Sequence, residues 1–367
     1  MQIKALPTFD EGYSLIRAHR CFARRYTEHS PFSLRSFELM QQPATFDCQT
    51  VPSCRVSVPP ENTFMRHESG PAADASPRVG KAGSGRAALS IDVEDWFHAG
   101  NLGGVNPSAT WNSYESRVER NTMRMLEILE VSKVRATFFV LGWVAERSPK
   151  LVRTIAEAGH EVACHGHSHQ LVYSLQPHEF RADVSRAKRY LEDLLGMPVR
   201  GYRAPWFSIT DWAIPILQEV GFHYDSSFVP TFAHDRYGKL SGVDSDSPIA
   251  LLRQGFHEVC ISCLRIGKRG IPWGGGGYFR LVPYPLWIRG VRAILRSGRP
   301  YVFYIHPWEI DPDQPRVSGT KAIQAFRHRV NLARCEQRFT ALAGAFSWMT
   351  IGDLIADYVG HDSRCWR

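Results

Sequence analysis

The sequence has no apolar run of the length that a membrane-spanning helix needs. Such a helix takes about 20 consecutive apolar residues, and in this chain of 367 residues charged or polar side chains interrupt every apolar stretch earlier. Residues 1–7 also lack the unbroken apolar core and small-residue cleavage site of a secretory signal. The two absences predict a cytoplasmic protein without a transmembrane segment, and they leave peripheral contact with a membrane open.

Cysteine is also sparse, with eight residues in the whole chain. That number is too small for the disulfide framework that stabilises small secreted domains. Cys260 and Cys263 form one C-x-x-C pair, but no second pair stands at zinc-finger spacing, and the pair follows a strand-like segment rather than opening a helix. We therefore interpret both cysteines as structural.

Positive charge is in excess but is not concentrated in one region. The net charge of +8 favours an anionic partner, yet the lysines and arginines are scattered and form no stripe, so we expect no nucleic acid partner. A run of four glycines, residues 274–277, lacks the following Lys-Ser or Lys-Thr of a phosphate-binding loop. The run indicates a tight loop instead.

The composition and the hydrophobic pattern of the sequence change near residue 87. Residues 1–86 are rich in Pro, Ser, Arg and Ala without sustained periodicity, and we expect a disordered N-terminal extension there. From residue 87 onward, apolar strand patterns alternate with helix patterns, such as Val118, Thr122 and Met125 on one face. The alternation is interrupted from about residue 230 to residue 298 and then resumes. This order predicts an α/β fold with parallel strands.

Two histidines have the spacing of metal ligands. His165 and His169 follow a short apolar strand and are separated by three residues, so both imidazoles can reach one ion. An acidic cluster, residues 92–95, follows an earlier strand, and two histidines with one carboxylate make a catalytic metal site that leaves room for water. His167 is directed elsewhere by its i+2 spacing. Because such spacing also arises by chance in a chain with 15 histidines, other segments have to support it.

Two further predicted strands end in polar residues. Arg203 follows the strand at 199–202, and His306 follows the strand at 301–305. Parallel α/β barrels carry their active sites at the carboxyl ends of the strands. We therefore expect Arg203, His306, the histidine pair and the acidic cluster to share one site, although a structural ion pair and a strand-end histidine would also explain the two residues.

In this order the polar segments resemble the NodB-type polysaccharide deacetylases, carbohydrate esterase family four. The resemblance covers roughly residues 87 to 355 and is closest to the deacetylases that accompany exosortase (XrtA, PEP-CTERM) exopolysaccharide loci. The segments that carry it are 90–98, 201–205, 224–227, 276–280 and 326–332. Such a set of motifs is far more specific than one histidine pair.

The resemblance implies a fold, a domain and an activity. The fold is a distorted (β/α) barrel, and the catalytic domain spans residues 87–358, with a subgroup-specific C-terminal part from about residue 230. The activity is metal-dependent hydrolysis of N-acetyl groups on a hexosamine-containing exopolysaccharide, with release of acetate. The partner is therefore an acetylated polysaccharide, and the sequence gives no indication of oligomeric state.

Catalytic roles also follow from the resemblance. Asp92 matches the general base, and Arg203 matches the arginine that keeps this base ionised. His306 matches the general acid that protonates the departing amine, and Asp225 matches the carboxylate that orients His306. A backbone N–H near Trp206, where the family often has tyrosine, would meet the developing oxyanion.

The metal ligands are the least settled part of the resemblance. It implies a divalent ion, with zinc as the first choice, held by His165, His169 and one carboxylate. Glu94 is favoured because it shares a strand face with Asp92, whereas Asp95 would serve if the chain turns after the strand. Gly166 replaces the Ser or Thr that the family commonly has, so we expect a less supported ligand loop.

Aromatic residues are frequent around the predicted site, and sugar rings pack their C–H faces on aromatic planes. The aromatic residues expected there are Trp96, Trp206, Phe207, Trp273, Tyr278 and Trp308. Core packing would explain them as well. Two other functions remain open, namely an allantoinase-like hydrolase of a small cyclic amide and an inactive carbohydrate-binding homologue, although a binding module needs neither a base nor an acid.

Overall fold

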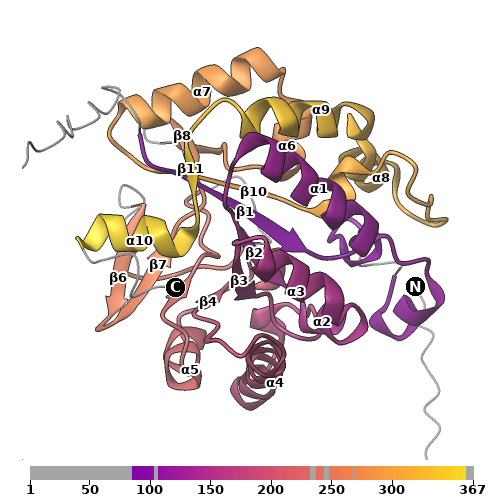
Figure 1. Cartoon of the computed structure of the whole chain (residues 1–367), viewed down its shortest axis with the longest axis vertical. Helices are drawn as coiled ribbons and strands as arrows, with labels where there is room; N and C mark the ends of the chain where they lie inside the picture. The colour runs from indigo at the N-terminus through magenta and orange to yellow at the C-terminus, as the bar shows by residue number, and fades with distance from the viewer. Residues whose placement is uncertain (1–84, 103–105, 232–236, 244–247, 268, 361–367) are drawn as a thin grey trace, which may run out of the picture. The chain divides into compact units, whose positions relative to one another are not determined.

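The computed structural model describes residues 85–102, 106–231, 237–243, 248–267 and 269–360 (Figure 1). The expected disordered extension therefore lies outside the described residues, apart from residues 85 and 86. Within the described part, strands and helices alternate from residue 87 onward, as the sequence pattern predicts. No helix in these ranges is both long enough and apolar enough to cross a bilayer.

A curled sheet forms the centre of the fold (Figure 1), with strand order β10-β1-β2-β3-β4-β5-β7-β6 and with β11 beside β1. Its strands are β1 Ala87–Val93, β2 Thr137–Val140, β3 Glu161–Cys164, β4 Gly201–Tyr202, β5 Tyr224–Asp225, β6 Ile249–Arg253, β7 Phe256–Val259, β10 Tyr301–Ile305 and β11 Trp348–Met349. Only the β6–β7 pairing in this sheet is antiparallel. The sheet curls into a half-barrel, so the expected distorted barrel is confirmed.

The register of the parallel strands brings their carboxyl ends to one edge of the sheet. Val93 pairs with Val140, Val140 with Cys164, and Cys164 with Tyr202. On the other side of β1, Ile91 pairs with the last residue of β10. The polar residues that follow these strands in the sequence therefore emerge side by side.

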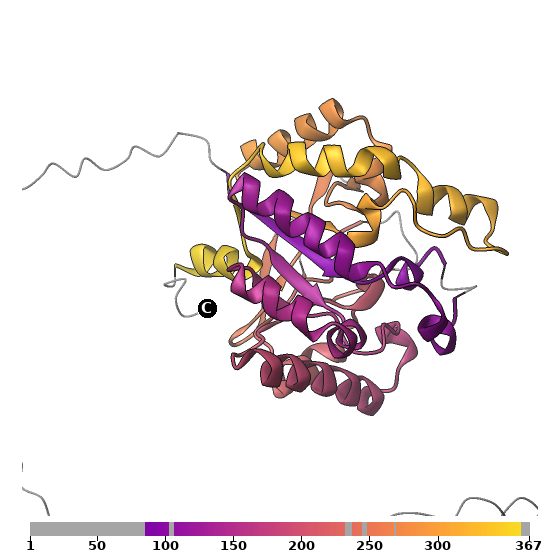
Figure 2. The ribbon, with the colours of Figure 1, turned by 45° about the vertical axis from the view of Figure 1, so that its right-hand side comes forward.

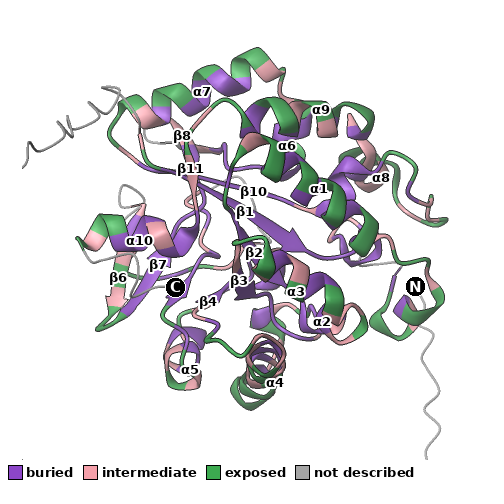
Figure 3. Cartoon of the chain, in the orientation of Figure 1, coloured by how far each residue is buried: buried purple, intermediate pink, exposed green. Residues whose placement is uncertain are grey.

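Amphipathic helices cover the outer side of the sheet (Figure 2). They include α1 Val118–Ser132, α2 Gly142–Arg147, α3 Pro149–Glu157, α4 Pro177–Leu195, α5 Ala213–Val220, α7 Tyr284–Arg296, α9 Leu332–Ala343 and α10 Ile351–Val359. In α1 the predicted face is buried, with Val118, Thr122 and Met125 at most 2% exposed. Figure 3 shows the same division for other helices, with a buried inner side and an exposed outer side. Burial of these apolar faces provides the main driving force for the fold.

The interruption from about residue 230 to residue 298 contains regular structure. After β6 and β7, a two-stranded antiparallel hairpin of β8 Cys263–Ile266 and β9 Arg269–Pro272 leads into α6 Gly276–Leu281. Cys260 and Cys263 are both buried in this region. Burial raises the pKa of the Cys263 thiol to about 12, which agrees with a structural role for the pair.

The run of four glycines brings the backbone very close to β10. The carbonyl of Gly274 accepts a hydrogen bond from Tyr304 N at 2.7 Å. Gly275 has φ of 142°, and a Cβ atom there would lie 1.9 Å from the carbonyl oxygen of Tyr304. At Gly277, in contrast, a Cβ would meet only Arg280 Nη2, at 3.9 Å. Gly274 and Gly275 thus let the chain run closely beside β10 before α6 begins at Gly276.

This difference predicts opposite results for two alanine substitutions in the same run. Gly275→Ala should lower the free energy of unfolding by about 3 kcal/mol, because the new Cβ overlaps a strand carbonyl and the φ angle is unfavourable for alanine. Gly277→Ala should change it by no more than about 0.5 kcal/mol, or raise it slightly, because alanine favours a helix. Urea denaturation measures both changes. Equal stability of the two variants would contradict the close contact between Gly275 and β10.

Candidate active site

The predicted site residues come together at the carboxyl edge of the sheet. Asp92 lies in β1, Glu94 follows β1, and His165, Arg203 and His306 directly follow β3, β4 and β10. Asp92, Glu94, His165 and Arg203 are at most 2% exposed. Four strands that are distant in the sequence therefore present one buried polar cluster.

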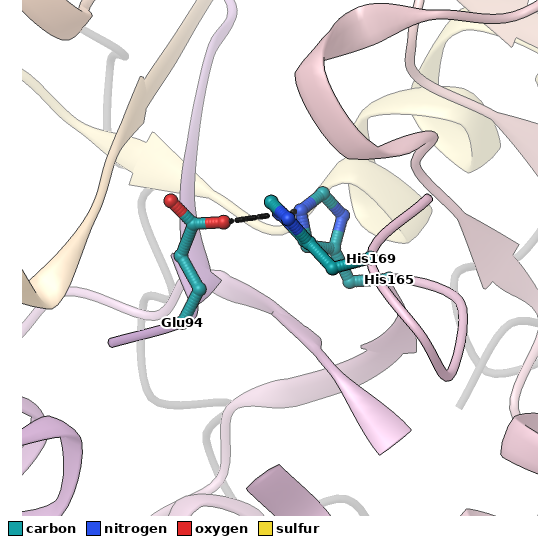
Figure 4. A group of neighbouring side chains, drawn as sticks. All are labelled: Glu94, His165 and His169. Carbon is teal, nitrogen blue, oxygen red and sulfur yellow. Dashed lines mark ion pairs between the residues drawn. The ribbon is translucent and has the colours of Figure 1, made fainter. Parts of the chain in front are cut away.

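Glu94, His165 and His169 form a candidate metal site. One ligand atom from each lies within 4.8 Å of the others, and Figure 4 shows the Glu94 carboxylate facing both imidazoles. Glu94 Oε2 lies 2.5 Å from Nε2 of His169 and 3.9 Å from Nε2 of His165. Donor atoms bound to one zinc ion at about 2.0–2.1 Å can lie at most about 4.2 Å apart, and both separations are within this limit. The donor set therefore fits a divalent ion.

Hydrogen bonds orient these ligands. The Nδ1 atom of His165 lies 2.9 Å from the carbonyl oxygen of Arg203, so the carbonyl fixes the tautomer and turns Nε2 toward Glu94. The indole N–H of Trp308 donates to Glu94 Oε1 at 3.0 Å. Burial opposes the charge of Glu94, but the positive charges of His169 and His306 outweigh it and hold the pKa of this carboxyl well below its usual range.

Asp95 has a different function in the structure. Its carboxylate accepts four hydrogen bonds, and the donors are Trp96 N, Ser116 Oγ, Arg117 N and Val118 N. These bonds cap the 3-10 helix η1, Trp96–His98, and the first turn of α1. The chain turns after β1, yet it is Glu94 that faces the histidines. Of the two carboxylates left open by the sequence, Glu94 alone lies in the cluster.

The histidine loop is supported from α4. Asp183 accepts hydrogen bonds from the backbone N–H groups of His167 and Ser168, at 2.7 and 3.0 Å. Gly166 has φ of 70°, and a Cβ there would approach Asp183 to 3.0 Å. The expectation that Gly166 leaves the loop less supported was therefore wrong, because Asp183 provides the missing hydrogen bonds. Sequence reasoning had not identified Asp183.

Arg203 fixes one oxygen of Asp92. Its Nη1 donates to Asp92 Oδ1 at 2.6 Å and to Ser90 Oγ at 2.7 Å. Its Nε and Nη2 donate to the carbonyl and hydroxyl oxygens of Ser226, at 2.7 and 2.9 Å. The guanidinium is fully buried and neutralises a buried carboxylate. The other oxygen of Asp92, Oδ2, faces His306 at 3.8 Å.

His306 is held by Glu309 in the 3-10 helix η5, Pro307–Ile310. The Nδ1 atom of His306 lies 2.8 Å from Glu309 Oε1, and its backbone N–H donates to the same oxygen at 3.2 Å. The Nε2 atom lies 3.7 Å from Glu94 Oε1. Burial disfavours the charged imidazole, but the negative charges of Glu94, Glu309 and Asp92 outweigh it and raise the pKa of His306 to about 9.

Asp225 does not contact His306, so the role expected for it was assigned to the wrong residue. Strands β4, β3, β2 and β1 separate β5 from β10 in the sheet, and Glu309 already occupies Nδ1 of His306. Asp225 Oδ1 instead accepts from Ser227 Oγ, which accepts from Ala204 N at 2.8 Å. Burial raises the pKa of Asp225, and it raises that of the adjacent Glu258 as well. The pair supports the segment that carries Arg203.

A cavity of about 370 Å³ opens over these groups. Its polar floor includes Asp92, Glu94, His165 and His306. Aromatic and apolar residues form much of its walls, namely Trp206, Phe207, Tyr237, Tyr278, Leu281, Tyr304, Trp308 and Phe326. Trp96 and Trp273, which were also expected near the site, pack in the hydrophobic core instead.

Two family models and several known proteins match parts of this chain. Residues 106–224 match the family model "Polysaccharide deacetylase", and residues 226–356 match a "Domain of unknown function (DUF3473)". A peptidoglycan deacetylase of Helicobacter pylori is 29% identical over 106 residues, which cover 29% of this chain and 36% of that protein. A peptidoglycan-N-acetylglucosamine deacetylase of Bacillus cereus is 32% identical over 90 residues, or 24% of this chain and 33% of that protein.

The match to these curated relatives thus spans 36% and 33% of their own lengths. The similarity in fold covers more of the chain than the similarity in sequence. A crystal structure of a Mycobacterium smegmatis protein assigned to the polysaccharide deacetylases superposes with a TM-score of 0.51 at 23% identity, covering 78% of this chain and 94% of that one. Residues 106–224 are therefore similar to the polysaccharide deacetylases.

Proposed function

We propose that this protein hydrolyses N-acetyl groups on the hexosamine units of a polysaccharide and releases acetate. The observation that carries the proposal is the position of two proton-transfer groups beside a metal-type cluster. Asp92 Oδ2 and His306 Nε2 lie 3.8 Å apart, and His306 Nε2 lies 3.7 Å from Glu94. All three side chains line one cavity. A module that only binds carbohydrate has no use for such a pair.

The metal would be a divalent cation, with zinc as the first choice, held by Glu94, His165 and His169. Bound there, it would polarise the acetamide carbonyl and lower the pKa of a water molecule. Asp92 would act as the general base and take the proton of the attacking water. Arg203 occupies Asp92 Oδ1, so Oδ2 is the oxygen available for this proton.

His306 would act as the general acid. Glu309 holds its Nδ1 and leaves Nε2 facing the cavity, where it can protonate the amine as the C–N bond breaks. A backbone N–H near Trp206, which lines the same cavity, would donate to the developing oxyanion. Base and acid would then act on the same acetamide from neighbouring positions.

The aromatic walls support an amino-sugar substrate, because sugar rings pack on aromatic planes. The curated relatives include peptidoglycan deacetylases and a chitooligosaccharide deacetylase of Bradyrhizobium, 34% identical over 86 residues. We propose an acetylated exopolysaccharide of an exosortase (XrtA, PEP-CTERM) locus as the substrate, from the resemblance of segments 90–98 and 326–332. We also propose that residues 87–358 act as one catalytic domain.

The first prediction from this proposed function concerns acetate release. Zinc-loaded protein incubated with N-acetylglucosamine oligomers should release acetate, and Asp92→Asn and His306→Gln should each lower kcat by roughly 10²- to 10⁴-fold because each removes one proton-transfer group. His178→Gln, an exposed histidine on α4, should leave the rate unchanged. An enzyme-coupled acetate assay gives all four rates.

Other outcomes of this assay would favour the alternatives. Hydrolysis of a cyclic amide such as allantoin, without acetate release from any saccharide, would indicate the small-substrate enzyme. Glycan binding without hydrolysis of either substrate would indicate a binding homologue. Full activity of Asp92→Asn would exclude Asp92 as the base.

The second prediction separates the two neighbouring carboxylates. Glu94→Gln should weaken zinc binding by roughly 100-fold or more, because it removes a ligand rather than a supporting group. Asp95→Asn should leave zinc affinity nearly unchanged but lower the thermal stability of the metal-free protein, since Asp95 caps two helices. Calorimetric zinc titration and thermal denaturation measure the two effects, and a reversed pattern would assign the ligand to Asp95.

The third prediction concerns the support of Glu94. Trp308→Phe keeps a stacking ring between His306 and His328 but removes the N–H that donates to Glu94. Zinc affinity should fall by about 10-fold, as is usual when an outer hydrogen bond to a ligand is lost. Trp212→Phe, a partly buried tryptophan on the outer side of the fold, serves as the control in the same titration. Equal affinities of the two variants would show that the Trp308 hydrogen bond does not matter.

A further inference from the structure

Two segments that carry the family resemblance, 276–280 and 326–332, take no direct part in the proposed chemistry. Arg280, the penultimate residue of α6, joins them. Its side chain is 1% exposed, and it lies within residues 226–356, which match the domain of unknown function. A fully buried arginine beside an active-site cavity has a high desolvation cost, so its contacts must compensate for it.

The contacts of Arg280 run in two directions. Its Nε donates to Glu309 Oε2 at 2.6 Å. Its Nη1 and Nη2 donate to three backbone carbonyls at the end of α8, Ala322–Arg329, and just beyond it. These carbonyls belong to His328, Val330 and Arg327, at 2.9, 2.8 and 3.1 Å.

We propose that Arg280 is a positioning residue of the active site, which sets the orientation of His306 through Glu309 and fixes the cavity wall at the end of α8. The proposal rests on the proposed function, because it concerns the group that would protonate the leaving amine. Arg280 acts through other residues and itself takes no proton from the substrate.

The first half of the proposal follows from the way Glu309 is shared. Its Oε2 faces Arg280, and its Oε1 faces both Nδ1 and the backbone N–H of His306. With both oxygens occupied, the carboxylate cannot rotate without breaking a contact. The imidazole that it holds therefore points Nε2 into the cavity. Glu309 is fully buried, so without the guanidinium its charge would lack a cationic partner of fixed position.

The second half follows from the carbonyls. Phe326, Arg327 and Val330 line the cavity on the side of α8, and Phe326 is 55% exposed. The carbonyls that Arg280 binds belong to Arg327, His328 and Val330, which all lie in this wall segment. The same guanidinium thus holds the acid group and the surface against which a sugar ring would pack.

Lysine could not replace these contacts. The guanidinium directs donors to a carboxylate and to three carbonyls at once, whereas an ammonium is a compact charge on a flexible stem. Arg280→Lys therefore keeps the positive charge but loses the geometry. Arg338 provides the matched control, because its Nη1 donates to the carbonyls of Phe279, Arg280 and Val282 without contacting Glu309.

The kinetic test compares two substrates with different leaving groups. For acetylated glucosamine oligomers, Arg280→Lys should lower kcat by about 100-fold, the order expected when a reacting group is misplaced by about 1 Å, and should raise KM. For 4-nitrophenyl acetate, whose phenolate departs without a proton, kcat should stay near that of the unmutated protein. Arg338→Lys should match the unmutated protein on both. Equal losses on both substrates would indicate general damage and overturn the proposal.

A spectroscopic test does not depend on activity. In histidine-labelled, zinc-loaded protein, the Nδ1–H of His306 bound to Glu309 should give a downfield, slowly exchanging proton signal, assigned by its absence in His306→Gln. The signal should persist in Arg338→Lys and disappear in Arg280→Lys. Its persistence in Arg280→Lys would overturn the proposal. Absence of acetate release by the unmutated protein would instead contradict the proposed function, while the signal still reports on Arg280.

Discussion

The site depends on the groups that balance the negative charges of three buried carboxylates at one end of a sheet. Asp92, Glu94 and Glu309 are each at most 2% exposed and lie around one cavity. A buried carboxylate is costly unless a cation and hydrogen-bond donors satisfy it. Arg203 balances the charge of Asp92, and Arg280 balances that of Glu309. The neighbouring histidines balance the charge of Glu94. The positions of the arginines and histidines follow from this requirement.

This balance of charges crosses the boundary between the two regions matched by family models. His165 and Arg203 lie in residues 106–224, whereas His306, Glu309 and Arg280 lie in residues 226–356. Strand β1, which carries Asp92, precedes both regions and pairs with β2 on one side and β10 on the other. The region of unknown function therefore contributes side chains to the same cavity, because parallel pairing through β1 aligns the ends of all these strands.

The sequence was sufficient for residues at the end of an apolar strand or directly after it. Asp92, His165, Arg203 and His306 could be placed together because the carboxyl ends of parallel strands meet at one edge. Glu309, Trp308, Asp183 and Arg280 could not, because each acts through a contact across the fold rather than through a repeated pattern. Asp225 was misassigned for the same reason, since its motif matched the family while its strand lies across the sheet from His306. The sequence could not decide whether Glu94 or Asp95 is the metal ligand, because the answer depends on the path of the turn after β1.

The two arginines have parallel roles, which explains why both side chains are arginine. Arg203 directs one nitrogen to Asp92 and the others to Ser226, and Arg280 directs one nitrogen to Glu309 and the others to backbone carbonyls. Each therefore fixes a carboxylate and a loop at once, which a lysine cannot do. Trp308 links the two networks, because it stacks on His306 and donates to Glu94. Since the proposed base, the proposed acid and the metal-type cluster share these supports, substitutions among them should be strongly non-additive. Their effects cannot then be divided into independent contributions of single residues.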